Sequence, residues 1–338
     1  MIPIRTAPDA LSRAREVVSP AMTAAIARLT PDIRRVASYH LGWTDADGQP
    51  VAASGGKGVR AALAVLSAEA AWADSSVGIP GAVAIELVHN FSLIHDDVID
   101  GDETRRHRPT VWALFGVGQA IVVGDALQTL AHHVLLDVPG VGVAAARVLA
   151  DATAAMIAGQ ADDIAFETRI NVSIDQCVAM SAGKTGALLG CASSIGAVLA
   201  GAPDATVGAL RDFGTHLGLA FQAVDDLLGI WGDPDRTGKP AGSDLRQRKK
   251  TLPVVAALAS GADEAMELRG LLCDGTLDEA QVERAVWLVE ACGARSWTAN
   301  RAKAHLDTAL GALNRVRMNP LAHRELSDLA AFVVERES

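Results

Sequence analysis

Apolar residues recur along almost the whole chain at intervals of three and four, the spacing of one face of an α-helix. In residues 80–100 they cover so broad a surface that this helix is expected to be largely buried. Similar spacing predicts helices near 10–40, 58–74, 119–136, 142–165, 174–200, 205–230, 248–260, 278–310 and 321–336. Alternating β-branched runs joined by Asn-Gly or Asp-Gly are almost absent, so a sheet is not expected.

Segments rich in polar residues, glycine or proline separate the predicted helices. They lie at 45–56, 101–110, 139–142, 201–204 and 232–243. No linker-like tract divides the chain, and no fixed-period repeat is evident. The pattern therefore predicts an all-α fold in which residues 1–338 form one domain, a bundle of about ten or more helices.

Composition narrows the class of protein further. Of the 338 residues, 50% are hydrophobic but only 4% are aromatic, which favours closely packed helices over a β-sandwich. The net charge of −10 argues against a nucleic-acid partner. Four scattered cysteines without CxxC spacing indicate a reduced, cytoplasmic protein. Residues 186–202 are only marginally long enough to span a membrane and rich in Gly and Ser, so we expect no stable membrane insertion.

The stretch HDDVIDGDETRRHRP, residues 95–109, crowds carboxylates together and follows them at once with arginines. On a helix, Asp96 and Asp100 project from one face with Cβ atoms about 6 Å apart, while Asp97 points to a neighbouring face. A polar surface turn is the ordinary explanation, but this pair interrupts an apolar helix. The EF-hand frame is out of register. A metal ion bridging to a phosphate fits both charge signs.

A second acidic pair has the same setting. Asp225 and Asp226 interrupt another apolar helix, and the loop that follows, up to residue 251, is strongly basic. Two apolar helices that each carry an acidic pair followed by basic residues suggest two walls of one cavity. Their carboxylates could hold Mg²⁺ while water and phosphate oxygens fill its other positions. Nearby Lys and Arg would take up the remaining phosphate charge.

Together these motifs resemble the trans-isoprenyl diphosphate synthases, or polyprenyl synthetases, over residues 50–255. GGKGVR (55–60) resembles the family's GGKRxR, and DDVID (96–100) with RRHRPT resembles its first aspartate-rich motif. GKTG (183–186) matches its Lys-Thr motif, and FQAVDD with the following GK, SD and KKT matches its second aspartate-rich region. The resemblance implies an isoprenoid synthase-like bundle around a central cavity. It also implies a Mg²⁺-dependent prenyltransferase that adds isopentenyl diphosphate head to tail to dimethylallyl, geranyl or farnesyl diphosphate.

Two positions depart from the family pattern. Gly58 stands where the family usually has Arg, and Gly229 stands where it has Asp, so the second motif is DDLLG. Lys57 and Arg60 flank the first departure and remain basic. By resemblance the first Asp of the second motif, Asp225, is the direct metal ligand. We therefore expect altered electrostatics and not a lost site.

The resemblance also assigns roles to individual residues. Asp96, Asp100 and Asp225 would bind the metal, three Mg²⁺ ions with substrate bound, while Asp226 and Asp244 would act through water or other ligands. The allylic diphosphate would contact Arg105, Lys184 and Lys239. Isopentenyl diphosphate would contact Lys57, Arg60, His89 and Arg106. Thr185 and Gln222 would turn their dipoles toward the carbocation. His89 alone could equally be a core histidine bonded to a backbone carbonyl. Its place two helical turns before Asp96 keeps it on the cavity side.

By similarity to the family, product length is set four and five residues before Asp96. Small Ser92 and bulky Phe91 favour a C20 product, geranylgeranyl diphosphate, with C15 next. The alternative is that Phe91 is core packing and the tunnel is closed elsewhere. Two other functions stay open: a non-catalytic subunit of a heterodimeric synthase, which Gly58 and Gly229 would favour, and a terpene cyclase on the same fold. A homodimer through helices 119–136 and 142–160 is expected from the resemblance.

Overall fold

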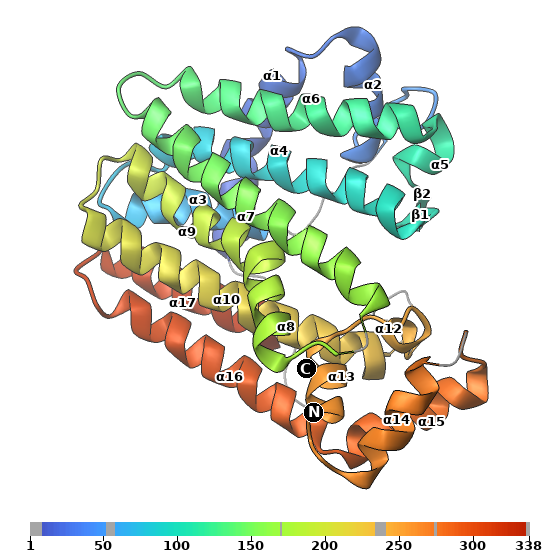
Figure 1. The fold of residues 1–338 in the computed structure, drawn as a ribbon. Coiled ribbons are helices and arrows are strands. Elements are labelled where there is room, and N and C mark those ends of the chain that lie inside the picture. Colours follow the sequence, from blue (N-terminus) through green and yellow to red (C-terminus); the bar gives the residue numbers. More distant parts are fainter. Residues whose placement is uncertain (1–8, 52–57, 170, 234–240, 274–275, 336–338) are drawn as a thin grey trace.

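The structure is a computed structural model, which describes residues 9–51, 58–169, 171–233, 241–273 and 276–335. Within those ranges the fold is all-α, as the periodicity predicts (Figure 1). The α-helices are α1 (Asp9–Ile26), α2 (Pro31–His40), α3 (Val59–Ala70), α4 (Ser75–Asp100), α5 (Val111–Phe115), α6 (Val117–Leu136), α7 (Gly142–Thr168), α8 (Ile174–Ser181), α9 (Ala187–Leu199), α10 (Asp204–Trp231), α12 (Ser243–Arg246), α13 (Leu252–Leu258), α14 (Asp263–Cys273), α15 (Glu279–Ala291), α16 (Ala294–Leu313) and α17 (Pro320–Glu335). A π-helical turn, η1 (Ala182–Gly186), joins α8 to α9, and two short strands, β1 (Thr104–Arg105) and β2 (Arg108–Pro109), form one antiparallel hairpin.

The long helices run roughly alongside one another in a bundle. α4 packs between α3 and α6, α9 packs against α3 and α10, and α10 packs against α16. Figure 1 shows α12 to α15 gathered at one end of this bundle, beyond the last turns of α10. One large apolar core runs through the long helices, and a smaller one lies under α13 to α15.

Close approach of small residues explains the low aromatic content. A Cβ added at Gly196 of α9 would overlap the backbone of Ala64 on α3. The Gly196 N–H donates to the Ser67 hydroxyl, at 2.9 Å, across the same contact. The helices thus pack backbone to backbone, as the composition predicts, and few large rings are needed to fill the core.

Several predicted segments have different boundaries in the structure. Residues 10–40 form two helices, because the chain leaves the helix before Pro31, which starts α2. Residues 278–310 also form two, separated at Gly293, whose φ of +72° is left-handed. The sequence analysis missed α14, whose apolar residues Ala265, Leu268 and Leu272 form only a narrow buried stripe.

Three stretches are long and apolar enough, by length and composition alone, to cross a membrane. They are Ser75–Asp100, Gly142–Thr168 and Ile174–Leu199, and 61%, 44% and 67% of their most apolar windows are buried inside the bundle. The first also carries Asp96, Asp97 and Asp100 at its end. Their apolar faces therefore serve, in large part, the packing of the bundle.

Candidate active site at two acidic helix ends

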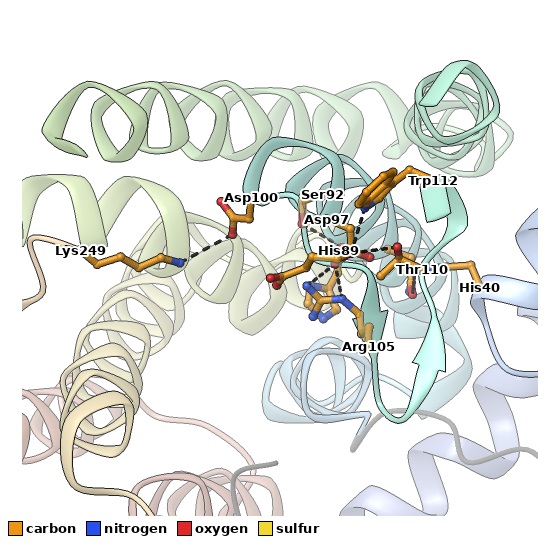
Figure 2. Close-up of polar contacts among 11 residues, drawn as sticks. His40, His89, Ser92, Asp97, Asp100, Arg105, Thr110, Trp112 and Lys249 are labelled. Atoms are coloured by element: carbon orange, nitrogen blue, oxygen red, sulfur yellow. Dashed lines mark hydrogen bonds and ion pairs between the residues drawn. The ribbon is translucent and has the colours of Figure 1, made fainter. Parts of the chain in front are cut away.

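The first acidic motif forms the last turn of α4, which ends at Gly101 with a left-handed φ of +68°. Asp97 is 1% exposed, and its Oδ1 accepts hydrogen bonds from Arg105, with Nε and Nη2 both at 2.7 Å (Figure 2). Its Oδ2 is buried without a hydrogen-bond partner among the described residues. Asp97 therefore fastens the hairpin to α4, while Asp96 and Asp100 remain on the neighbouring face, as the helical spacing predicts.

The hairpin after α4 presents two arginines in a fixed order. The residues between its strands, Arg106 and His107, both have positive φ, +52° and +61°, as the central pair of a type I′ turn requires. The Asp102 carbonyl accepts bonds from Thr110 Oγ1 and Trp112 Nε1, both at 2.9 Å, and so anchors the base of the hairpin (Figure 2). The tight turn places Arg105 and Arg106 beside the buried half of α4.

A cationic cluster lies two turns before the aspartates. Arg60 Nη1 is 3.4 Å from His89 Nε2. Burial, followed by the charges of Arg60 and Arg106, holds the pKa of His89 well below its usual range. The ring is therefore neutral, and Nε2 can accept from the Arg60 guanidinium. Three of the four residues expected to bind isopentenyl diphosphate thus lie together; the fourth, Lys57, lies outside the described residues.

His40, which the sequence analysis did not identify, belongs to the same cluster. Its Nε2 is 3.1 Å from Asn90 Oδ1. Burial, then the charges of Arg105 and Arg106, lower the pKa of His40 to about 3, so this ring is also neutral. A pocket beside it is lined by Tyr39, His40, Leu41, Gly42, Asp97, Arg105, Arg106, Arg108, Pro109, Thr110 and Val111. No motif marks His40, because only the packing of α2 brings it to this place.

Lys184 lies on the π-helical turn η1, which packs unusually close to α7. A Cβ added at Gly159 of α7 would overlap the backbone at Lys184. One turn further along α7, Asp163 accepts from Lys184 Nζ at 2.6 Å. A π-helical turn inside a helix is common at functional sites. Asp163 is a second residue that the sequence analysis missed; its signal was an acidic pair, 162–163, within an apolar helix.

Asp96 faces both of these residues. Burial raises the pKa of Asp96 to about 6; Lys184 and Arg105 lower it, while Asp100 and Asp163 raise it further. A carboxylate that is buried near like charges binds a cation more favourably than an isolated one does, because the cation removes the repulsion. The α4 end, α7 and η1 therefore enclose one acidic region that contains a lysine.

The second acidic motif lies on the last turns of α10, and its two aspartates face opposite ways. Asp225 is exposed. Asp226 is 5% exposed, and its oxygens accept from Gln222 Nε2 and from the Leu252 backbone N–H, both at 2.8 Å. Gln222 Oε1 in turn accepts from Thr185 Oγ1 at 2.7 Å. Burial, against the bonds from Leu252 and Gln222, raises the pKa of Asp226 to about 7.

Lys249 connects the two acidic ends. Its backbone N–H donates to the Asp244 carbonyl at 2.9 Å, and its Nζ lies 3.7 Å from Asp100 Oδ2 (Figure 2). Burial lowers the pKa of Lys249, but Asp100, Asp163, Asp244 and Asp102 together raise it above its usual value. In the sequence this lysine belongs to the KKT motif, and the resemblance assigns it no role of its own. Lys239, which it did assign to the allylic diphosphate, lies outside the described residues.

The donor set fits a hard divalent cation. Carboxylate oxygens are the ligands that Mg²⁺ prefers, and Mg²⁺ usually keeps several waters or phosphate oxygens. Among the described residues, no group of three or more His, Cys, Asp or Glu side chains is close enough to hold a metal alone. The walls therefore offer only part of a coordination shell, which a phosphate-bearing ligand would complete.

The chain is similar to known proteins over most of its length. A family model, polyprenyl synthetase, matches residues 43–289. The chain is 48% identical to a (2E,6E)-farnesyl diphosphate synthase of Mycobacterium tuberculosis, which covers 99% of this chain and 94% of that protein. It is 44% identical to a geranylgeranyl diphosphate synthase of the same organism, over 97% of this chain and 93% of that one.

Solved structures show the same fold. The crystal structure of a polyprenyl synthetase from Streptomyces coelicolor superposes with a TM-score of 0.92 at 52% identity, over 96% of this chain and 99% of that one. A geranylgeranyl pyrophosphate synthase from Corynebacterium glutamicum, complexed with isoprenyl diphosphate and magnesium, superposes with a TM-score of 0.83 at 27% identity, over 98% and 100% of the two chains.

Proposed function

This chain belongs to the polyprenyl synthetase family, and from this premise we propose that it joins isopentenyl diphosphate to an allylic diphosphate to give a short all-trans prenyl diphosphate. Its relatives are prenyl diphosphate synthases, so the chain is a transferase. Relatives that match nearly the full chain carry synthase activities in their names, which does not favour the non-catalytic subunit or the terpene cyclase. The observation that carries the proposal is the pairing of two acidic helix ends with a separate cationic cluster.

Each part of this arrangement has a distinct task. The cluster of Arg60, His89 and Arg106 would bind the isopentenyl diphosphate, with Lys57 beside them. Arg105, Lys184 and Lys239 would bind the allylic diphosphate, whose departure creates the carbocation. Arg105 uses two of its five N–H donors on Asp97, so its remaining donors are available to a phosphate. Such fixed cationic donors stabilise the charge that develops on the leaving group.

Mg²⁺ would be held by Asp96, Asp100 and Asp225, in up to three ions with substrate bound. The magnesium in the Corynebacterium relative supports this assignment. Bound there, the metal would act as a Lewis acid toward the departing diphosphate. Asp226, Gln222 and Thr185 form a hydrogen-bonded chain, which would orient the Thr185 dipole. Asp244 would act from the following loop.

We propose geranylgeranyl diphosphate (C20) as the main product and farnesyl diphosphate (C15) as the next. Phe91 is 6% exposed and meets the His95 ring edge to face, with centroids 4.9 Å apart. A ring fixed in this way would stop the growing chain after a few additions, while Ser92 is small and would obstruct the chain less. Chromatography of the products from C5, C10 and C15 primers tests this. We expect C20 as the longest product from all three, and accumulation of C15 alone would refute it.

We also propose a cytoplasmic homodimer through α6 and α7. The outer faces of these helices expose large apolar side chains: Val117, Ile121, Val122, Val143, Ile157 and Ile164. Large exposed apolar side chains on two helices that pack together favour a subunit interface there. Sedimentation should show a dimer that Ile121→Glu with Ile157→Glu converts to a monomer. A wild-type monomer would refute the assembly without affecting the chemistry.

The condensation itself is tested with the purified chain, Mg²⁺, isopentenyl diphosphate and geranyl diphosphate. We expect pyrophosphate release that requires both substrates, because each has its own anion pocket. Arg60→Ala should raise KM for isopentenyl diphosphate while leaving release dependent on Asp96. No release by the chain alone would favour a non-catalytic subunit, and turnover of the allylic substrate alone, unaffected by Arg60→Ala, would favour a cyclase.

A further inference from the structure

The glycine that interrupts the second acidic motif lies directly beneath another carboxylate. A Cβ added at Gly229 would lie 2.9 Å from Oδ1 of Asp244 and closer still to its Cγ and Oδ2. Real Cβ atoms do not come this near to other heavy atoms. The carboxylate of Asp244 therefore occupies the space in which a side chain at position 229 would begin.

Two contacts and one buried neighbour hold Asp244 in this place. The Gly242 N–H donates to the Ile230 carbonyl at 3.1 Å, and Ser243 Oγ lies 3.3 Å from the Gly229 carbonyl. Leu245, the next residue, is fully buried. The segment that begins α12 is thus bound to the last turns of α10, and the position of Asp244 is set by the backbone on both sides.

Position 229 is on the same face of α10 as Asp225, so a carboxylate placed there could act together with that of Asp225. Residues 225 and 229 are one turn apart, so a side chain at either position faces the same side of α10. Asp226 points away, because both of its oxygens accept hydrogen bonds from the protein. Without Asp244 this face of α10 would present a single carboxylate, that of Asp225.

Asp244 also interacts with a lysine that reaches the opposite wall. Its charge raises the pKa of Lys249, whose ammonium lies near Asp100 of α4. A glycine inside a helix is destabilising relative to alanine. Its presence in the last turns of α10 is explained by the close approach of Asp244, which any larger residue would prevent.

We propose that Asp244 supplies the carboxylate that Gly229 lacks, so that Asp225 and Asp244 together form the cation site of the α10 wall. Gly229 is then the residue that makes room for a ligand from the next segment. This inference rests on the proposed function, because it concerns the same divalent cation. It assigns to Asp244 a direct part in holding that cation, in place of an action through water.

Binding of Mn²⁺ to the metal-free chain tests the inference without reference to turnover. Mn²⁺ favours the same octahedral oxygen ligands as Mg²⁺, and electron paramagnetic resonance counts the free ion directly. We expect Asp244→Asn to weaken Mn²⁺ binding by about tenfold or more. Gly229→Ala should weaken it by a similar factor, although it removes no oxygen, because the methyl group displaces Asp244.

Gly208→Ala is the matched control. Gly208 lies on the same helix, and a Cβ there would meet nothing within 4 Å, so Mn²⁺ binding should be unchanged. The exchange variant Gly229→Asp with Asp244→Gly should regain most of the wild-type affinity, because it returns the carboxylate from α10 itself. Circular dichroism of each variant establishes that the helices are intact.

Two results overturn the inference: wild-type Mn²⁺ affinity in Gly229→Ala, or wild-type affinity in Asp244→Asn. Either result, with Mn²⁺ binding lost in Asp225→Asn and pyrophosphate still released by the wild type, refutes the role of Asp244 and leaves the proposed function intact. Failure of the wild type to bind Mn²⁺ would also overturn the inference, whereas failure of the wild type to release pyrophosphate would instead refute the proposed function.

Discussion

The last turns of α4 and α10 carry the same sequence pattern, two adjacent aspartates in an apolar helix followed by basic residues, and use it in parallel ways. In both, the second aspartate is buried and fastens the next segment. Asp97 binds the Arg105 side chain, and Asp226 binds the Leu252 backbone N–H. In both, the first aspartate lies on a different face from the second: Asp96 is partly buried and Asp225 is exposed. One carboxylate of each pair thus builds the wall, and the other serves the site.

The two walls differ at the fifth position of the motif. The α4 wall has Asp100, which the helix itself provides, whereas the α10 wall has Gly229 beneath Asp244. The first wall is therefore complete within one helix, and the second depends on the docking of α12. The metal affinity of the α10 wall can therefore depend on how the segment after α10 docks, while the α4 wall stays unchanged.

The largest effect is expected from the first aspartates. Asp96→Asn and Asp225→Asn should each lower kcat by about 10² to 10³, because each removes a charge that stabilises the ionising diphosphate complex. Pyrophosphate release at saturating substrate measures this. Similar losses would establish that both walls act in the same step; a loss confined to Asp96 would show that the α10 wall contributes little.

The first aspartates of the two walls, Asp96 and Asp225, should also differ in how they affect the dependence of stability on pH. In EDTA, the raised pKa of Asp96, about 6, means that the folded chain holds its proton more tightly than the unfolded chain. Its contribution to the free energy of unfolding is therefore present at low pH and is lost as the pH rises through about 6. Asp96→Asn, which does not titrate, should gain stability over the wild type with rising pH, by up to about 3 kcal/mol.

Melting temperatures of the wild type and Asp96→Asn between pH 4.5 and pH 8 measure this difference. Asp225→Asn is the control, because Asp225 is exposed on the other wall. A difference between Asp96→Asn and the wild type that does not change with pH would contradict the expectation. Saturating Mg²⁺ with pyrophosphate should reverse the order, since only the wild type then gains the full effect of the ligand.

Substituting a buried aspartate tests whether it holds the following segment against its helix. Asp226→Ala leaves the Leu252 N–H and the Gln222 amide without their acceptor, which costs about 1–3 kcal/mol. Removing a buried carboxylate of raised pKa offsets part of this loss. Thermal unfolding in EDTA should show a decrease of a few degrees, with Asp225→Ala as the control. A decrease that is equal in both variants would argue against a specific role for Asp226.

Lys249 should give the smallest effect and couples the two walls. In the metal-free chain its ammonium lies among the carboxylates that a divalent cation would need. Lys249→Met should therefore strengthen the binding of Mn²⁺ alone by a few fold, on the order of 1 kcal/mol for one partly exposed ion pair. Lys250→Met is the neighbouring control. Weaker Mn²⁺ binding in Lys249→Met would show that the lysine does not compete with the cation.

Local regularities in the sequence determined most of the fold. The helical class follows from apolar spacing, because an amphipathic helix buries one stripe wherever it packs. Asp96, Asp97 and Asp100 could be given their faces for the same reason. The split helices were missed where a single residue, Pro31 or Gly293, ends an apolar pattern that otherwise continues.

Only the tertiary structure decided which distant residues meet. Asp163 reaches Lys184 because Gly159 lets η1 approach α7, and His40 joins the arginine cluster because α2 packs beside the hairpin. The role of Gly229 was likewise hidden: in sequence it is a missing aspartate, and in space it lies under Asp244. Periodicity reports which way a side chain faces on its own helix, but a site joined across helices depends on backbone approaches that no local pattern records.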